Sequence, residues 1–106
     1  MTDDGAPDLA GLCADVASEL DEVTSSPDGD SLTYRRGSVP FARVSGSMLE
    51  VRLPADIGEA ALRTPDTTTI AGESSWVHFT PRDEGRHVTD RAEAWFRTAW
   101  RHAGDN

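Results

Sequence analysis

Two segments in the last third of the chain constrain its fold most. Residues 74–81 alternate between two sets of side chains, which is the two-residue period of a β-strand. Residues 92–103 instead carry apolar side chains at helical spacing, so these form one continuous stripe. Because aromatic side chains dominate core packing in a small domain, we predict that this strand and this helix build the core. The predicted core residues are Trp76, Phe79, Trp95, Phe96 and Trp100.

The beginning of the chain predicts another helix. Asp8 has a side chain preferred at a helix N-cap, and the cluster of chain breakers at residues 25–29 ends the pattern. The polar residues 1–7 are predicted to be disordered. The helix has an apolar stripe at the expected spacing, made of Leu9, Leu12, Cys13, Val16, Leu20 and Val23.

Three short runs with alternating side chains follow, at residues 31–36, 39–44 and 47–53. A short turn containing glycine separates each pair of runs, which is typical of antiparallel hairpins. Pro40 cannot donate a hydrogen bond to a neighbouring strand, so it places the start of the second run at a sheet margin. The three runs are therefore predicted to form a meander.

The remaining segments complete the predicted order. Pro54 suits the first turn of a short helix, and residues 67–70 are β-branched and form either a weak strand or a loop. Thr89 or Asp90 is expected to cap the last helix, and Gly104 to end it. The predicted order is α-β-β-β-α-(β)-β-α within one domain, residues 8–104. The apolar residues of the short helix are Ile57, Ala60, Ala61 and Leu62, and Thr64-Pro65 is expected to end it.

Composition argues against several functions. The net charge is −9, with 19 acidic and 10 basic residues, and the basic residues are all arginine because the chain has no lysine. Affinity for duplex DNA comes mainly from cations that neutralise phosphates, so nucleic-acid binding is not expected. The arginine usage is typical of a GC-rich genome, and the acidity suits a salt-adapted, halophilic cytoplasm.

The N-terminus is acidic, and no apolar run approaches the 18 residues of a membrane span. We therefore expect a cytoplasmic protein without a membrane anchor. Cys13 is the only cysteine, so it cannot form an intramolecular disulfide or a metal site of four cysteines. It is interpreted as a small core residue, the alternative being a reactive thiol. No cofactor and no metal are predicted.

The order of elements and four segments resemble the MmcQ/YjbR-like domains and, equally, the small "luciferase domain" proteins. The similarity covers residues 30–103. It implies an α+β fold with an antiparallel sheet of four to five strands covered on one face by helices, and DNA binding has been suggested for YjbR-like members. No family catalytic residues exist to carry over, and the basic surface that DNA binding requires is lacking here. The matching segments are Phe41-Ala42-Arg43-Val44, Leu49-Glu50-Val51-Arg52-Leu53-Pro54, Ser74-Ser75-Trp76-Val77 and Trp95-Phe96-Arg97-Thr98-Ala99-Trp100.

Arginine side chains provide the candidate ligand site. Arg43 and Arg52 lie on adjacent predicted strands, where antiparallel pairing places them on one face, and guanidinium groups bind phosphate and carboxylate. The favoured interpretation, however, is that they pair with surrounding acids such as Glu50. His78 completes the candidate site; a metal site using it is the less favoured interpretation, because His87 and His102 are not expected to converge on it.

We therefore favour a non-enzymatic binding or interaction module for an unknown protein or a small anionic ligand. One alternative is a ligand-binding domain or small enzyme that uses Arg43, Arg52 and His78. A further alternative is the DNA binding suggested for YjbR-like members.

The acidic excess predicts a stability that rises with salt. Repulsion among the acids opposes the compact state, and the Debye length falls from about 10 Å at 0.1 M salt to about 3 Å at 1 M. The urea midpoint is therefore expected to be higher in 1 M than in 0.1 M NaCl. A flat or falling midpoint would show instead that local pairs with arginine already compensate the acids, since salt screens that attraction.

Overall fold

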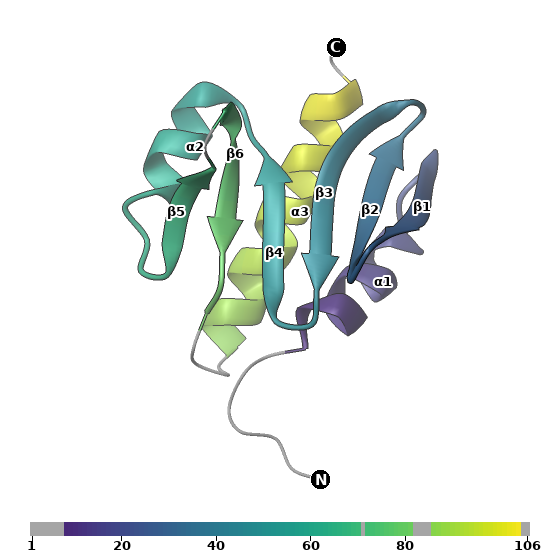
Figure 1. Ribbon diagram of the computed structural model, residues 1–106, viewed down its shortest axis with the longest axis horizontal. Coiled ribbons are helices and arrows are strands. Elements are labelled where there is room, and N and C mark those ends of the chain that lie inside the picture. Colours follow the sequence, from purple (N-terminus) through teal and green to yellow (C-terminus); the bar gives the residue numbers. More distant parts are fainter. Residues whose placement is uncertain (1–7, 71, 82–85, 105–106) are drawn as a thin grey trace, which may run out of the picture.

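Strands build one continuous sheet in the computed structural model, which describes residues 8–70, 72–81 and 86–104. Across this part of the chain, six antiparallel strands lie in the spatial order β1-β2-β3-β4-β6-β5 (Figure 1). The disorder predicted for residues 1–7 lies outside the described residues. In chain order the elements are α1 (Leu9–Ala17), β1 (Val23–Asp28), β2 (Ser31–Arg36), β3 (Val39–Ser45), β4 (Met48–Arg52), α2 (Ala55–Ala61), β5 (Thr67–Ile70), β6 (Glu73–Phe79) and α3 (Arg86–Gly104).

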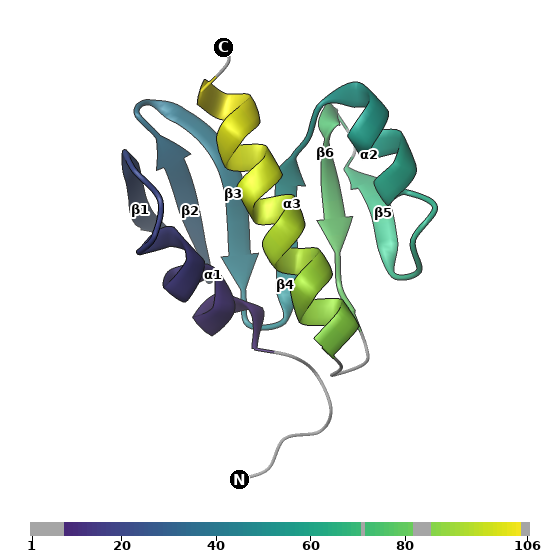
Figure 2. The same ribbon diagram turned by 180° about the vertical axis from the view of Figure 1, so that it is seen from behind.

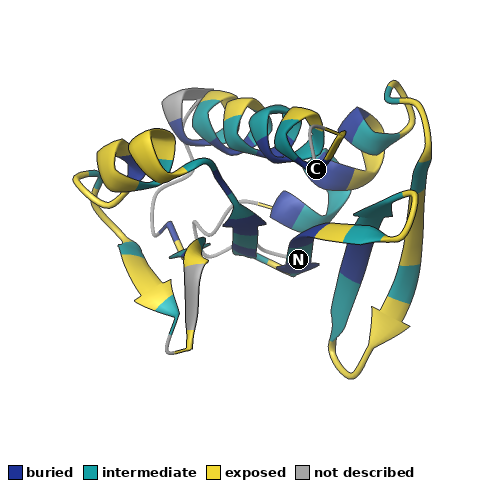
Figure 3. Ribbon diagram, turned by 90° about the horizontal axis from the view of Figure 1, so that it is seen from above, coloured by how far each residue is buried: buried dark blue, intermediate teal, exposed yellow. Residues whose placement is uncertain are grey.

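The helices of the described residues all lie on the same side of the sheet (Figures 2 and 3). The predicted α+β class, with helices covering one face of an antiparallel sheet, is therefore confirmed. The outer strands bend away from the helices, so the other face is concave (Figure 3). We call this uncovered surface the open face, and it is defined by Arg43, Met48, Glu50, Arg52, Trp76 and His78.

The first helix begins as predicted and ends earlier. The Asp8 carboxylate accepts a hydrogen bond from the Gly11 amide at 3.0 Å, which confirms the N-cap. The helix ends at Ala17, and Glu22 then adopts a left-handed conformation with φ of 64° that redirects the chain. Leu20 still packs against the core from this turn, which explains why the apolar pattern continued beyond the helix.

Residues 23–28 form a strand that the sequence did not predict. β1 pairs with β2 over six residues. The sequence had instead predicted a cluster of chain breakers over part of this segment. Pro27 is tolerated because β1 is an edge strand, where one side of the backbone needs no partner. Gly29 makes the turn with φ of 65°. This strand accounts for the observed order, α-β-β-β-β-α-β-β-α, and for a sheet of six strands.

The predicted meander is present as β2, β3 and β4. A bulge between Tyr34 and Arg35 shifts the register against β3. Both Phe41 and Ala42, next to the bulge, are buried. Residues 67–70, for which a strand and a loop were both considered, form the edge strand β5 paired with β6.

The core lies between the sheet and the helices, with Phe96 at its centre. The Phe96 ring meets Tyr34 and Phe41 edge-on, with 5.2 Å between ring centroids in each pair. Phe79 is also fully buried, and it packs edge-on against Trp95 at 5.0 Å. The predictions of Phe79 and Phe96 as core residues are confirmed.

The three tryptophans occupy more peripheral positions than predicted. Trp76 was wrongly placed in the core: it is half-buried on the open face, because Val77 and Phe79 are the set that faces the helices. Trp95 and Trp100 pack against the core without being buried in it. The reason is that α3 approaches the sheet along a narrow row, which consists of Val88, Ala92, Phe96, Ala99 and Ala103.

Two details of the other helices also differ from prediction. Thr89 and Asp90 are not caps, because α3 already begins at Arg86. Pro54 caps α2 instead of lying in its first turn, and of this seven-residue helix only Ala61 is buried. Ile57 and Leu62, two of the apolar residues named for this helix, are 36% and 37% exposed.

The core geometry predicts which aromatic residue matters most for stability. Phe96→Ala is expected to reduce the free energy of unfolding by about 3–5 kcal/mol, because it removes the ring contacted by Tyr34 and Phe41 and leaves a cavity. Trp76→Ala, the matched control on the open face, is expected to cost less than half as much. Urea unfolding followed by circular dichroism measures both, and equal losses would contradict the assignment of Phe96 to the centre.

Candidate functional site

Three polar side chains form a row across the open face. Arg43 on β3 lies opposite Glu50 on β4, and Glu50 lies opposite His78 on β6. Directly opposite residues of antiparallel strands point to the same face, so the pairing register alone brings the three together. The row thus joins segments that are separated in the chain by α2 and β5.

The carboxylate of Glu50 holds both of its neighbours. One oxygen lies 2.9 Å from Nε of Arg43 and the other 2.9 Å from Nδ1 of His78. The Arg43 contact is a close ion pair whose Nε–H does not have hydrogen-bond geometry. An ionised carboxylate only accepts hydrogen bonds, so Nδ1 of His78 carries the proton and donates it. The Glu50 side chain is only 17% exposed, which makes this row a fixed part of the surface.

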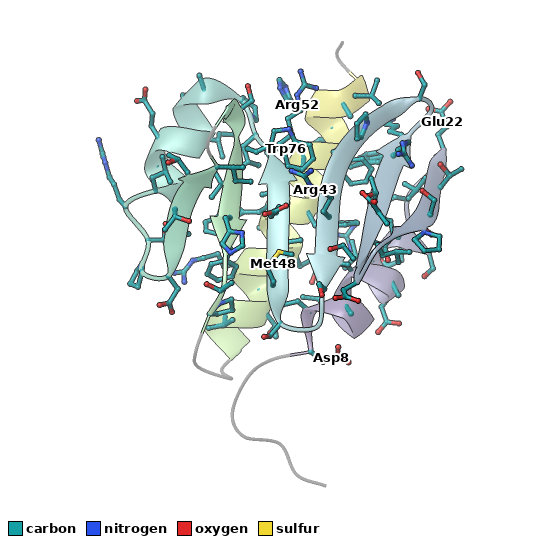
Figure 4. All side chains as sticks on the ribbon, viewed as in Figure 1. Asp8, Glu22, Arg43, Met48, Arg52 and Trp76 are labelled. Atoms are coloured by element: carbon teal, nitrogen blue, oxygen red, sulfur yellow. The ribbon has the colours of Figure 1, made fainter. Side chains whose placement is uncertain are left out.

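Trp76 extends the row toward one end of the sheet. It lies opposite Arg52 in the pairing of β6 with β4. Its indole reaches past β4 to β3, where the guanidinium carbon of Arg43 lies over the ring at 4.4 Å from the centroid. This distance is typical of a cation–π contact. Figure 4 shows Arg52, Trp76 and Arg43 following one another along the middle of the open face.

A hollow of ≈ 360 Å³ lies beside the indole of Trp76. Among the described residues of its lining, Arg52 contributes the only charged group, and no described carboxylate lies within ion-pair distance of that guanidinium. Arg36 and Arg97, by contrast, pair with Glu22 and Glu19. The hollow is lined by Ser38, Val39, Pro40, Arg52 and Trp76.

The structure places all three candidate residues on the open face. Arg43 and His78 are joined through Glu50, which confirms the favoured interpretation for Arg43, whereas Arg52 lacks such a partner among the described residues. Arg52 remains the cation with space beside it. Trp76 was missed as a site residue, although the alternation had already put it in one set with His78, and a set that contains histidine is the better candidate for the exposed face.

A second hollow, of ≈ 340 Å³, opens between α1 and the β1–β2 hairpin. Burial raises the pKa of Tyr34, which forms part of its wall. None of its lining side chains is charged, so it offers shape but little specificity for an ionic ligand. Its lining consists of Ala14, Ala17, Ser18, Val23, Thr24, Ser25, Leu32 and Tyr34.

The described residues offer neither a metal site nor a membrane-spanning helix. Among the residues that the structure describes, no group of three or more histidine, cysteine or acidic side chains is placed to hold a metal ion. His78 lies on the open face, whereas His102 lies in the last turn of α3 on the other side, so these two do not converge. The side chain of His87 is not described. No helix within the described ranges is sufficiently long and apolar to span a membrane.

Comparison of the chain with protein-family models, with curated proteins and with solved structures finds no match.

Cys13 belongs to the core and not to a reactive site. The side chain is buried in α1, and burial, with a smaller effect of the Asp8 carboxylate, raises the pKa of the thiol from its ordinary value of 9.0 to about 12. Because the thiolate is the nucleophile, the thiol is inert at neutral pH in the folded protein.

We predict that Cys13 reacts with a thiol reagent at pH 8 more slowly in the folded protein than in urea, by on the order of 1,000-fold, because the thiolate is scarcer. The pKa of the Cys13 thiol is higher in the folded state than in the unfolded state. Its contribution to the free energy of unfolding is therefore fully present below pH 9 and is lost as the pH rises toward 12. Stopped-flow absorbance with an aromatic disulfide measures the rates, with Cys13→Ala as the control. Comparable rates in both states would contradict the core assignment.

Proposed function

We propose that the protein is a non-enzymatic binding module that takes a small anionic ligand on its open face. The observation that carries this proposal is Arg52: in a chain of net charge −9, its guanidinium lies beside a hollow without a described carboxylate in reach. Arg63, Arg91 and Arg101 also lack an ion pair among the described residues, but none of them lines either hollow. A guanidinium left beside an indole is suited instead to an external anion.

The row on the open face supports this proposal because it fixes the surroundings of Arg52 in advance. Glu50 holds Arg43, and Arg43 lies over the ring of Trp76. A site whose side chains are already ordered loses less entropy when a ligand binds. His78 is fixed by the same carboxylate at the opposite end of the row.

The pair of Glu50 and His78 also favours a second candidate, a small enzyme. A carboxylate that orients an imidazole through Nδ1 is the arrangement that supports general-base catalysis at Nε2. In the described residues, however, no serine, threonine or cysteine side chain is hydrogen-bonded to His78. The same carboxylate also serves Arg43, so we favour a positioning role for the pair.

DNA binding is the candidate that the resemblance to YjbR-like domains brings. The α+β sheet covered on one face supports a relationship to these domains, which we retain as a proposal. A net charge of −9 opposes the approach of a polyanion, and Arg43 is already paired with Glu50. We therefore propose a small anion as the ligand.

A titration of the ¹⁵N-labelled protein tests the proposed function. Organic anions from a small panel are expected to shift backbone amides of β3, β4 and β6 with a dissociation constant at or below ~1 mM, and neutral analogues and duplex DNA are expected to leave them unchanged at low salt. Shifts in 1 M NaCl should be weaker, because the attraction is ionic. The proposal fails if anions perturb only the hollow beside α1, or if DNA produces the salt-sensitive response.

A further inference from the structure

We infer that the hollow beside Arg52 and Trp76 is a subsite for an aromatic monocarboxylate. This inference rests on the proposed function and specifies the class of ligand. It follows from the charge of the hollow, the nature of its walls and its size, each of which limits what can occupy it.

The charge of the hollow selects a single negative group. Arg52 is the one cation among the described residues of its lining, and the nearby guanidinium of Arg43 is compensated by Glu50. A monoanion would therefore be neutralised by Arg52, whereas a phosphate dianion would bring a second charge into a chain that is already strongly acidic. A planar carboxylate also matches the two parallel N–H groups of a guanidinium.

The walls of the hollow select a flat, apolar body for the same ligand. Val39 and Pro40 on β3 line it together with the indole of Trp76. Arg43 lies over the indole ring and is itself held by Glu50, so the aromatic wall is fixed in position. Aromatic rings pack favourably against an indole, and proline offers a rigid apolar surface without an N–H that would need a partner.

Polar groups at the hollow complete the match to a carboxylate. The indole Nε1 of Trp76 has no acceptor among the described residues, whereas Nε1 of Trp100 donates to the Asp21 carbonyl. Ser38 adds a hydroxyl to the lining. Arg52, Trp76 and Ser38 of the lining thus all carry side-chain donors, and the described lining has no carboxylate that would repel an anion.

The volume of ≈ 360 Å³ limits the ligand to a small one. It lies near the lower end of the usual range for ligand pockets, about 300–1,000 Å³. A compound with one ring and one carboxylate is therefore the appropriate probe, and phenylacetate is such a compound.

The test follows the tryptophan side-chain N–H signals of ¹⁵N-labelled protein, with the Trp76 signal assigned from its loss in Trp76→Phe. Phenylacetate is expected to shift this signal in a saturable manner. Phenylacetamide, which lacks the charge, and acetate, which lacks the ring, are each expected to bind at least tenfold more weakly. Phenylphosphonate, a dianion at pH 8, is expected to bind more weakly than phenylacetate.

Two variants separate Arg52 from a general effect of charge. Arg52→Gln is expected to weaken phenylacetate binding at least tenfold, and Arg101→Gln, which removes the same charge from exposed α3, is expected to leave it unchanged. If Arg52→Gln does not fold, Arg52→Lys keeps the charge without the paired N–H groups, and it is expected to bind severalfold more weakly than the wild type.

The outcomes distinguish this inference from the proposed function. Tighter binding of phenylphosphonate or of phenylacetamide at Trp76 would refute the monocarboxylate class, and so would shifts confined to the signals of Trp95 and Trp100. If phenylphosphonate is the tighter ligand, an anion still binds on the open face and the proposed function stands; if the neutral phenylacetamide is, the proposed anionic ligand fails as well. If neither phenylacetate nor phenylphosphonate shifts any amide of β3, β4 or β6, both proposals fail.

Discussion

The packing of α3 on the middle of the sheet is the interaction on which the rest of the structure depends. Phe96 contacts Tyr34 and Phe41 from a helix row that otherwise carries small residues, so the helix lies close to the sheet. The large apolar side chains of β3, β4 and β6 are therefore buried on this side. The alternate residues of the same strands remain for the open face, and they include the charged row and Trp76.

Much of this arrangement could be predicted because strand and helix periods are local properties. The meander, the Asp8 cap and the stripe of the last helix all follow from spacing within a few residues. Alternation identifies two sets of side chains in a strand, but it does not tell which set faces the helices. Hydrophobicity alone placed Trp76 inside, whereas Val77 and Phe79 are the side chains of β6 that are buried. β1 was missed because it is stabilised by pairing with β2 and not by its own composition.

The candidate site was predictable to a similar degree. Arg43 and Glu50 face each other across one short turn, so a hairpin register is sufficient to pair them. The contact of Glu50 with His78 depends on how β6 aligns with β4 after α2 and β5 intervene, and no local pattern specifies that alignment. The hollow beside Arg52 requires the three-dimensional position of Pro40 as well, which the sequence analysis used only to locate a sheet margin.

The lining of the hollow distinguishes Arg52 from the paired arginines. The chain has 19 acidic residues for 10 arginines, yet among the described side chains only Arg36, Arg43 and Arg97 form ion pairs with acids. Arg97 illustrates this pairing, since hydrogen bonds to Glu19 and Glu93 raise its pKa. Around Arg52, the lining contains an indole, a proline, a valine and a serine instead. Because these neutral side chains do not compensate the positive charge of Arg52, an anionic ligand does not have to displace a carboxylate of the chain. A ligand with a single negative charge can therefore bind the guanidinium.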